Sequence, residues 1–262
     1  MSSSCPALLV AGTDTGVGKT VATVLLISAL RRRGLRVLAM KPAESGCDGG
    51  AADAAALAAV SGDDEPAQGP GDHDLCPYRL SLPVAPESAA AAEGRTIELG
   101  VLEAALARLR ADADLVVVES AGGLGSPYGP GLLVLDLARA LGLPVLLVAA
   151  DRLGTVGQTV VALRLMAHEA VRCVGVVLSR VDAAPPGPDE PTNAPLVRAH
   201  GGGVPLVAGL PHLPDMPPAR DPRDWAARRA ASLESQGQLD AELMRGALGQ
   251  RTALGAREER TP

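Results

Sequence analysis

The segment that decides the fold is Ala7-Leu8-Leu9-Val10-Ala11-Gly12-Thr13-Asp14-Thr15-Gly16-Val17-Gly18-Lys19-Thr20. It is an apolar strand followed by a glycine-rich turn and the start of a helix. In such a turn the backbone N–H groups converge on phosphate oxygens, and the helix N-terminus adds its positive dipole end. Lys19 is expected to reach the outer phosphates, and Thr20 to offer its hydroxyl to Mg²⁺. The common form of this motif would have its first glycine at Thr13, whereas this sequence has it one position earlier, at Gly12.

The composition predicts one large soluble α/β domain. The chain has 262 residues, of which 47% are hydrophobic, with no Phe, one Trp and two Tyr. The core must therefore be built from Ala, Val and Leu, and there is no aromatic platform on which bases could stack. A net charge of −6 also argues against a nucleic-acid partner. The longest apolar region, Leu132 to Ala150, contains charged residues, Gly and Pro, so it does not predict a membrane span.

The four cysteines predict a cytoplasmic location. They are scattered, with no Cys-x-x-Cys and no His at zinc spacing, which favours reduced thiols without a special role. The N-terminus has no basic segment ahead of its apolar run, and that run is needed as the first strand. We therefore expect no signal peptide.

Short apolar runs alternate with helical stretches along the chain. This alternation predicts a doubly wound, mainly parallel sheet flanked by helices, as in nucleotide-hydrolysing proteins with a phosphate-binding loop. The predicted strands are Ala7–Ala11, Leu35–Met40, Leu115–Val118, Val145–Ala149, Val174–Leu178 and Pro205–Ala208. The predicted helices between them are Val21–Arg33, Ala51–Val60, Leu132–Leu141 and Val156–Glu169.

The unusual polar and glycine-rich sequences come directly after strands. These are Gly12–Thr20, Lys41–Gly46, Glu119–Gly125 and Ser179–Asp182. Because ligands of parallel sheets collect at the carboxyl ends of the strands, we expect these segments to meet in one site.

The remaining segments carry less information. Residues 62–76 and 183–191 are predicted loops, and the composition changes beyond about Pro214 to Arg, Asp, Glu and Ala. Surface helices are predicted at Pro222–Ala231, with Asp221 as its cap, and at Gln238–Leu248. Residues 1–248 are predicted to form one domain, with an insertion at about 214–232, and residues 249–262 a disordered tail.

A metal site is predicted where a carboxylate closes the third strand. Mg²⁺ needs oxygen ligands besides Thr20, and Glu119 follows four apolar residues at that position. Asp53 is a second candidate, although its place near the start of an Ala-rich helix is equally explained by helix-dipole and capping preferences.

A second basic side chain is predicted beside the phosphates. Pro42 and Gly46 shape a turn that directs Lys41 and Ser45 to the same rim as Lys19. Two lysines beside one triphosphate favour stabilisation of a transferred phosphoryl group or an anionic nucleophile. Taken alone, Lys41 is equally well explained as a solvated lysine at a strand end.

Together these motifs resemble the family of ATP-dependent dethiobiotin synthetases. The loop Gly12–Thr20, with its longer glycine spacing, is similar to the phosphate loop of that family. Similar segments follow in the family's order: Lys41-Pro-Ala-Glu-Ser-Gly46, Pro83-Val-Ala-Pro86 with Glu93-Gly94, Val118-Glu-Ser-Ala-Gly-Gly123, Asp136–Pro144, Leu153-Gly-Thr155 and Gly209-Leu-Pro211.

The resemblance implies a reaction and a set of roles. The family joins CO₂ to both amines of 7,8-diaminopelargonic acid, closing a cyclic urea with cleavage of ATP to ADP and phosphate. By matching position, the resemblance assigns Lys19 and Lys41 to the triphosphate and carbamate charges, and Thr15 and Ser45 to the carbamate or phosphoryl oxygens. It assigns Mg²⁺ to Thr20, Asp53 and Glu119, residues 12–20 to the phosphates, and Ser179, Gly209 and Pro211 to the rest of the nucleotide.

The resemblance also implies a homodimer with its active site near the interface. In the family, the helix start after Leu153-Gly154-Thr155 helps to bind the substrate carboxylate across that interface. Here the segment continues as Val156-Gly157-Gln158, where the family usually has Ile-Asn-His. Two further departures are Glu87, in place of the family's His, and Ser179, in place of the Asn that reads adenine.

Two other functions remain open from the sequence. One is a partition- or septum-type ATPase that dimerises around ATP as a switch. Such proteins carry an additional lysine early in the loop, where this chain has Thr13-Asp14, and basic amphipathic helices for DNA or membrane. The other is a synthetase paralogue with a different substrate.

Overall fold

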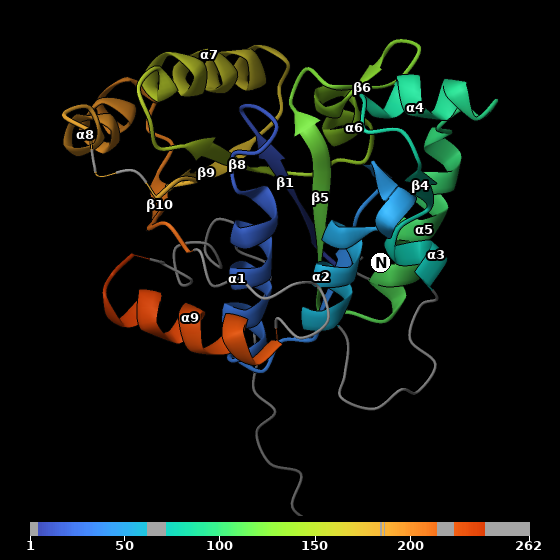
Figure 1. Ribbon diagram of the computed structural model, residues 1–262, viewed down its shortest axis with the longest axis horizontal. Helices are drawn as coiled ribbons and strands as arrows, with labels where there is room; N and C mark the ends of the chain where they lie inside the picture. The colour runs from blue at the N-terminus through green and yellow to red at the C-terminus, as the bar shows by residue number, and fades with distance from the viewer. Residues whose placement is uncertain (1–4, 62–71, 184, 186, 214–222, 239–262) are drawn as a thin grey trace, which may run out of the picture.

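The computed structural model describes residues 5–61, 72–183, 185, 187–213 and 223–238 (Figure 1). A six-stranded sheet forms its centre, with the strand order β10-β9-β8-β1-β5-β2 and parallel pairing throughout. Its strands are β1 (Ala7–Gly12), β2 (Val37–Met40), β5 (Leu115–Gly123), β8 (Val145–Ala150), β9 (Cys173–Ser179) and β10 (Leu206–Leu210). The predicted doubly wound fold is therefore confirmed, and all six strands match predicted ones.

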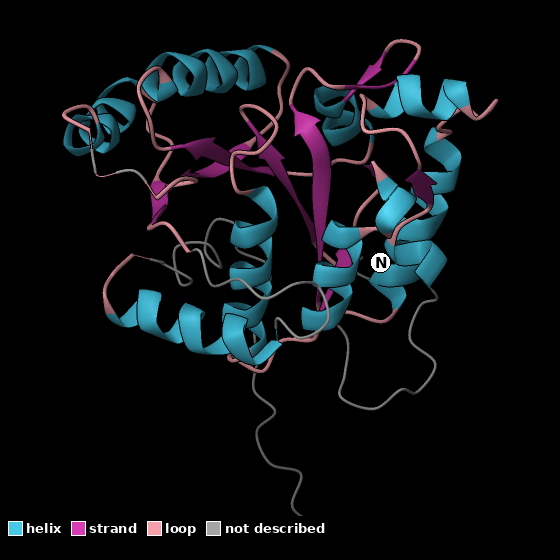
Figure 2. Ribbon diagram, viewed as in Figure 1, coloured by secondary structure: helices cyan, strands magenta, loops and turns pink. Residues whose placement is uncertain are grey.

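Helices cover both faces of this sheet, as Figure 2 shows. One face carries α1 (Lys19–Arg31), α2 (Ala52–Val60) and α9 (Arg223–Ser235). The other carries α4 (Pro86–Ala92), α5 (Leu99–Ala111), α6 (Val134–Ala140), α7 (Thr155–His168) and α8 (Glu190–His200). Alternate residues of each strand belong to the two cores: in β1, Leu8 and Val10 pack on the first face and Leu9 and Ala11 on the second. Burial on both faces explains why the strands are continuous apolar runs.

Smaller elements lie beside the carboxyl edge of the sheet. They are the parallel pair β3 (Ala43–Ser45) and β4 (Tyr78–Leu80), the antiparallel pair β6 (Pro127–Gly129) and β7 (Leu132–Leu133), the 3₁₀ turn Cys47–Gly49, and α3 (Asp72–Leu75). Along the chain β3 follows β2, β4 follows α3, and the β6–β7 pair follows β5.

Several predicted boundaries were wrong. Residues 72–75, predicted as loop, form α3, and the predicted helix at 132–141 begins only after β7. The predicted loop at 183–191 ends early because α8 starts at Glu190, with Pro191 in the first turn, where a missing N–H leaves no hydrogen bond unmade. Sequence analysis also missed α5, an amphipathic helix that buries Leu102, Ala105, Leu106 and Leu109.

The C-terminal predictions are tested only in part. Helix α9 runs from Arg223 to Ser235, longer than predicted, and it overlaps the stretch at about 214–232 that was taken for an insertion. It packs against α1 and α2 through Trp225, Ala226, Ala230 and Leu233. The proposed cap Asp221, residues 239–248 of the last predicted helix, and the tail 249–262 lie outside the described residues. In the described part of the chain, every helix is too short or too polar to cross a membrane.

Candidate active site

The phosphate loop joins β1 to α1 and depends on its glycines. Gly18 adopts a left-handed conformation (φ 90°) as the residue that caps α1, which a side chain would strain. At Gly12 a Cβ atom would lie 2.6 Å from the Asp14 carbonyl oxygen, so only glycine lets the loop fold back on itself. Lys19 donates a hydrogen bond from Nζ to that same carbonyl at 3.1 Å. The early glycine is thus a requirement of the loop's shape.

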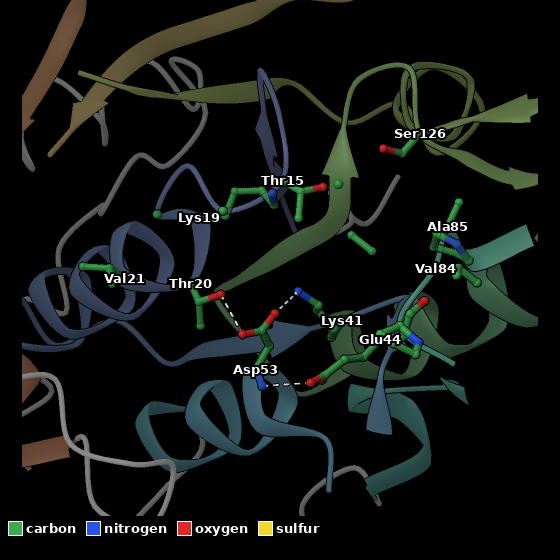
Figure 3. Close-up of a pocket in the computed structure, with 17 residues that line it drawn as sticks. Thr15, Lys19, Thr20, Val21, Lys41, Glu44, Asp53, Val84, Ala85 and Ser126 are labelled. Atoms are coloured by element: carbon green, nitrogen blue, oxygen red, sulfur yellow. Dashed lines mark hydrogen bonds and ion pairs between the residues drawn. The ribbon is translucent and has the colours of Figure 1, made fainter. Parts of the chain in front are cut away.

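Four predicted side chains meet below the loop. Lys41, which follows β2, has its Nζ 2.6 Å from Glu119 Oε1 and 2.8 Å from Asp53 Oδ2. Thr20 Oγ1 lies 2.9 Å from Glu119 Oε1 and 3.0 Å from Asp53 Oδ1. The parallel sheet explains the meeting, because β2 and β5 are adjacent and Met40 is in register with Val118. Figure 3 shows Asp53 lying between Thr20 and Lys41.

Burial makes these charges interdependent. Glu119 is fully buried and Lys41 is only 2% exposed. Burial by itself would lower the pKa of Lys41, but the charges of Glu119 and Asp53 outweigh it and hold the pKa above its ordinary value. Burial likewise works against ionised Asp53, yet the Lys41 charge keeps its pKa below normal. The pKa of Lys19 is lowered by burial and then by Lys41. Removing one of these partners would leave a buried charge uncompensated.

The donor set suits a hard divalent cation. Among the residues that the structure describes, no group of three or more His, Cys, Asp or Glu side chains is placed to hold a metal by itself. Thr20, Asp53 and Glu119 instead supply a hydroxyl and two carboxylates, the oxygen ligands that Mg²⁺ prefers beside phosphates. Glu119 Oε2 is buried without a hydrogen-bond partner, which leaves it a lone pair to offer. These residues fit Mg²⁺.

A cavity of about 710 Å³ opens above this cluster. One part of its wall comes from the phosphate loop and α1, and the other from the segments after β2, β4 and β5 (Figure 3). The predicted site residues that line it are Thr15, Gly16, Gly18, Lys19, Thr20, Lys41, Ser45 and Asp53. The hydroxyl of Ser45 is buried without a partner in the structure. This hydroxyl is therefore available to a ligand.

Other predicted residues lie elsewhere. Glu119 is beneath the cavity, and Gly12, Thr13, Asp14 and Val17 are in the part of the loop behind it. Ser179 packs against the back of the phosphate loop, where its Oγ would be 2.5 Å from a Cβ atom at Gly18. Gly209 and Pro211 are at the end of β10, and the Gly209 N–H donates to the Gln238 carbonyl at 3.1 Å. The structure therefore separates this nucleotide-side group from the cavity.

The cavity also contains residues to which sequence analysis gave no role. Glu44 and Ser126 line it, as do Val21, Ala121 and Gly122. Ser126 Oγ accepts a hydrogen bond from the Gly123 N–H at 2.9 Å and would be only 2.0 Å from a Cβ atom at Gly122. Pro83-Val-Ala-Pro86, one of the segments that resemble the synthetase family, lines the cavity with all four of its residues.

The two site lysines are the only lysines in the sequence. Every other basic side chain among the 24 Lys and Arg residues is arginine. A compact ammonium fits between Glu119 and Asp53 at hydrogen-bond distance from both, whereas the planar guanidinium of arginine is larger and presents a fixed fork of donors. Lysine at these two positions therefore supplies a compact point charge.

Comparisons with known proteins give the family. A model described as an AAA domain matches residues 6–220. An ATP-dependent dethiobiotin synthetase of Anaeromyxobacter dehalogenans (strain 2CP-C) is 42% identical over 234 residues, which cover 87% of this chain and 95% of that protein. The synthetase of Xylella fastidiosa (strain 9a5c) is 40% identical over 231 residues, covering 86% and 97%.

Solved structures agree on the fold alone. The MinC:MinD cell division protein complex of Aquifex aeolicus has a TM-score of 0.54 at 14% identity, covering 96% of this chain and 99% of that one. A ParA family ATPase from Chlorobium tepidum TLS also has a TM-score of 0.54 at 14% identity, covering 93% and 99%. The two synthetases are far closer to this chain in sequence than these structures are. The chain belongs to the family of ATP-dependent dethiobiotin synthetases, which are ligases.

Proposed function

We propose that this protein closes a cyclic urea on 7,8-diaminopelargonic acid with CO₂, using Mg²⁺ and ATP and releasing dethiobiotin, ADP and phosphate. The observation that carries the proposal is the cavity in which the phosphate loop faces the segment Pro83–Pro86. One side offers cations and hydroxyls to a triphosphate, and the other offers an apolar wall to an aliphatic chain.

The roles of the side chains follow from their positions. Lys19 and Lys41 stabilise negative charge on the γ-phosphate and on the carbamate, since both line the cavity. Thr15 and Ser45 donate hydrogen bonds to carbamate or phosphoryl oxygens. Thr20, Asp53 and Glu119 would hold Mg²⁺, which when bound neutralises charge on the β- and γ-phosphate oxygens.

The bond changes balance in three steps. One substrate amine adds to CO₂ and loses a proton, giving a carbamate. A carbamate oxygen then attacks the γ-phosphorus as the bond to ADP breaks, giving a carbamic-phosphoric anhydride. The second amine attacks the carbonyl carbon, phosphate leaves, and the ring closes. The protein forms no covalent bond, so catalysis rests on positioning and on fixed charge.

The adenine side is proposed at the ends of β9 and β10. Ser179, Gly209 and Pro211 would border the base, by the resemblance. Ser179 is 3% exposed and packs on Gly18. Its hydroxyl therefore offers the base fewer hydrogen-bonding groups than the amide of asparagine would. We expect Ser179→Asn to raise the preference for ATP over other nucleoside triphosphates in a competition assay. An unchanged preference would remove Ser179 from base recognition.

A homodimer through α7 is part of the proposal. Leu153, just before α7, is 83% exposed, and Val161 and Leu165, one turn apart on α7, are 66% and 42% exposed. Exposed apolar side chains in one stripe are typical of a protein interface. We expect sedimentation to show a dimer, and we expect Val161→Glu to dissociate it. The monomeric variant should have lower activity, because the active site is proposed to lie near the interface. A monomeric wild-type protein with full activity would contradict this part.

The switch-ATPase alternative is not favoured. The septum-site and partition proteins share the fold at 14% identity, whereas the synthetases share 40% or more of their residues over most of the chain. The two functions predict different ATP use. A synthetase cleaves ATP only with its diamine present, and a switch hydrolyses it alone.

Phosphate release therefore tests the function. Purified protein with Mg-ATP and bicarbonate should release phosphate only when 7,8-diaminopelargonate is added. Lys19→Ala and Glu119→Ala should abolish this release, and the circular-dichroism spectrum should confirm that each variant is folded. Robust hydrolysis without the diamine, or none with it, would refute the proposal.

Lysine labelling gives an independent test of the nucleotide site. An acyl-phosphate derivative of ATP acylates amines close to the bound phosphates. Because Lys19 and Lys41 are the only lysines, mass spectrometry should find the acyl group on one or both of them and nowhere else except the N-terminus. Excess ATP should prevent the reaction, and labelling that ATP does not prevent would contradict the assignment.

A further inference from the structure

Helix α2 begins without a cap of its own. The residue before it is Ala51, which has no side-chain oxygen, and no side-chain hydrogen bond caps the helix from that position. The first backbone N–H groups of a helix have no partner within the helix. Some other group must therefore accept them.

Glu44 of β3 is that group. Its Oε1 accepts the Asp53 N–H at 2.9 Å, and its Oε2 accepts the Ala54 N–H at 2.8 Å. Both oxygens of one carboxylate thus bind successive N–H groups at the positive end of the α2 dipole. Glu44 is 7% exposed, so these hydrogen bonds are made largely out of water.

The contact with Glu44 holds the backbone of Asp53, whose carboxylate binds both Lys41 and Thr20. Asp53 is held twice: its backbone by Glu44, and its carboxylate by Lys41 and Thr20 (Figure 3). Yet the side chain of Asp53 is 43% exposed, so packing alone does little to restrain it. The two hydrogen bonds of Glu44 tie the first turn of α2 to β3.

Glu44 also lines the cavity, and each of its oxygens accepts one backbone N–H group. Each oxygen keeps a further lone pair, so these hydrogen bonds do not by themselves bar contact with a ligand. Both of them, however, tie the carboxylate to the first turn of α2, which carries Asp53. We therefore expect Glu44 to contribute to the site through Asp53.

We propose that Glu44 is a positioning residue that holds the first turn of α2 so that Asp53 faces Thr20 and Lys41. The inference rests on the proposed function only in taking Asp53 as part of the Mg-nucleotide site. Outer partners that orient a ligand residue commonly change metal affinity or activity by about 10- to 100-fold when removed.

The test is the Mg²⁺ dependence of nucleotide binding, measured with a fluorescent, non-hydrolysable ATP analogue. Glu44→Ala removes both acceptors, and Glu44→Gln keeps one carbonyl oxygen at nearly the same volume. We expect Mg²⁺-dependent affinity to fall by about 10-fold or more in Glu44→Ala and by less in Glu44→Gln. Affinity without Mg²⁺ should stay close to wild type in both, because the phosphate loop is untouched.

Asp136→Asn is a matched control. Asp136 also accepts a backbone N–H at a helix start, that of Leu133 at 3.0 Å, but it belongs to α6 and does not line the cavity. This variant should bind Mg-nucleotide as wild type does. If weakening any helix start lowered the affinity for Mg-nucleotide, Asp136→Asn would lose affinity as well.

A double-variant cycle decides whether Glu44 acts through Asp53. In an Asp53→Asn background, Glu44→Gln should cause no further loss of Mg²⁺-dependent affinity. Full additivity would overturn the proposal, as would wild-type affinity in Glu44→Ala or failure of Glu44→Gln to fold. None of these outcomes depends on the diamine, so phosphate release can fail and refute the proposed function while the cycle still supports positioning by Glu44.

Discussion

Replacing Gly18 by alanine tests the construction of the phosphate loop directly. Gly18 has a φ of 90°, and a Cβ atom there would be 2.5 Å from Ser179 Oγ and 3.2 Å from Ser179 Cβ. Gly16 is in the same loop with a φ of 72°, but a Cβ atom there would meet nothing within 4 Å. The pair separates backbone strain from steric overlap.

The expected free energies follow from these two environments. Holding alanine in the left-handed region costs about 1–2 kcal/mol, which both variants share. Overpacking a close-fitting site adds about 1–3 kcal/mol, which falls on Gly18→Ala alone. We therefore expect a loss of stability of about 1–2 kcal/mol for Gly16→Ala and about 2–5 kcal/mol for Gly18→Ala.

The steric contribution is measured by urea unfolding of four proteins. These are the wild type, Gly18→Ala, Ser179→Ala and the double variant. Removing Ser179 Oγ relieves the shorter contact but leaves Cβ at 3.2 Å. The loss of stability in the double variant should therefore be smaller, by about 1–2 kcal/mol, than the sum of the losses in the two single variants. Equal losses in Gly16→Ala and Gly18→Ala, or strict additivity in the cycle, would refute the close approach of β9 to the loop.

Two further predictions concern buried charge and buried thiols. Lys41→Met should lower the free energy of unfolding by about 3–5 kcal/mol, because it leaves Glu119 buried without its cation. Urea unfolding measures this loss, and a value below about 1 kcal/mol would show that the pair is solvated. All four cysteines are free, and burial raises the pKa of Cys76 to about 12 and that of Cys173 to about 11. A higher pKa leaves less thiolate at a given pH, so iodoacetamide at pH 8 should label the more accessible Cys47 first, and peptide mapping that finds Cys76 labelled first would contradict this.

The sheet was predictable because its strands are buried on both faces. Continuous apolar runs such as 115–118 can be recognised without any knowledge of their neighbours. Two of the elements that sequence analysis missed, β3 and β4, are held by a contact between segments that are distant in sequence. β3 and β4 each have three residues and exist because Glu44 pairs in register with Arg79. No local pattern specifies that pairing.

The site residues also differ in whether a local sequence pattern reveals them. Lys19 and Thr20 belong to a local motif, and Glu119 stands out as a charge at the end of an apolar run. Asp53 was ambiguous from the residues alone, and its carboxylate meets Lys41 only because α2 packs beside β2. Glu44 gave no indication at all, because its role lies in hydrogen bonds to N–H groups nine and ten residues away. Positions set by tertiary contacts are not encoded in spacing.

In the proposed reaction, carbon from CO₂ enters a ring that is closed at the expense of ATP. The most direct measurement supplies ¹³C-bicarbonate, Mg-ATP and 7,8-diaminopelargonate and follows the product by mass spectrometry. We expect one labelled carbon in dethiobiotin for each ADP formed, and no product with Lys41→Ala. ADP formation without labelled dethiobiotin, or equal product from Lys41→Ala, would contradict it.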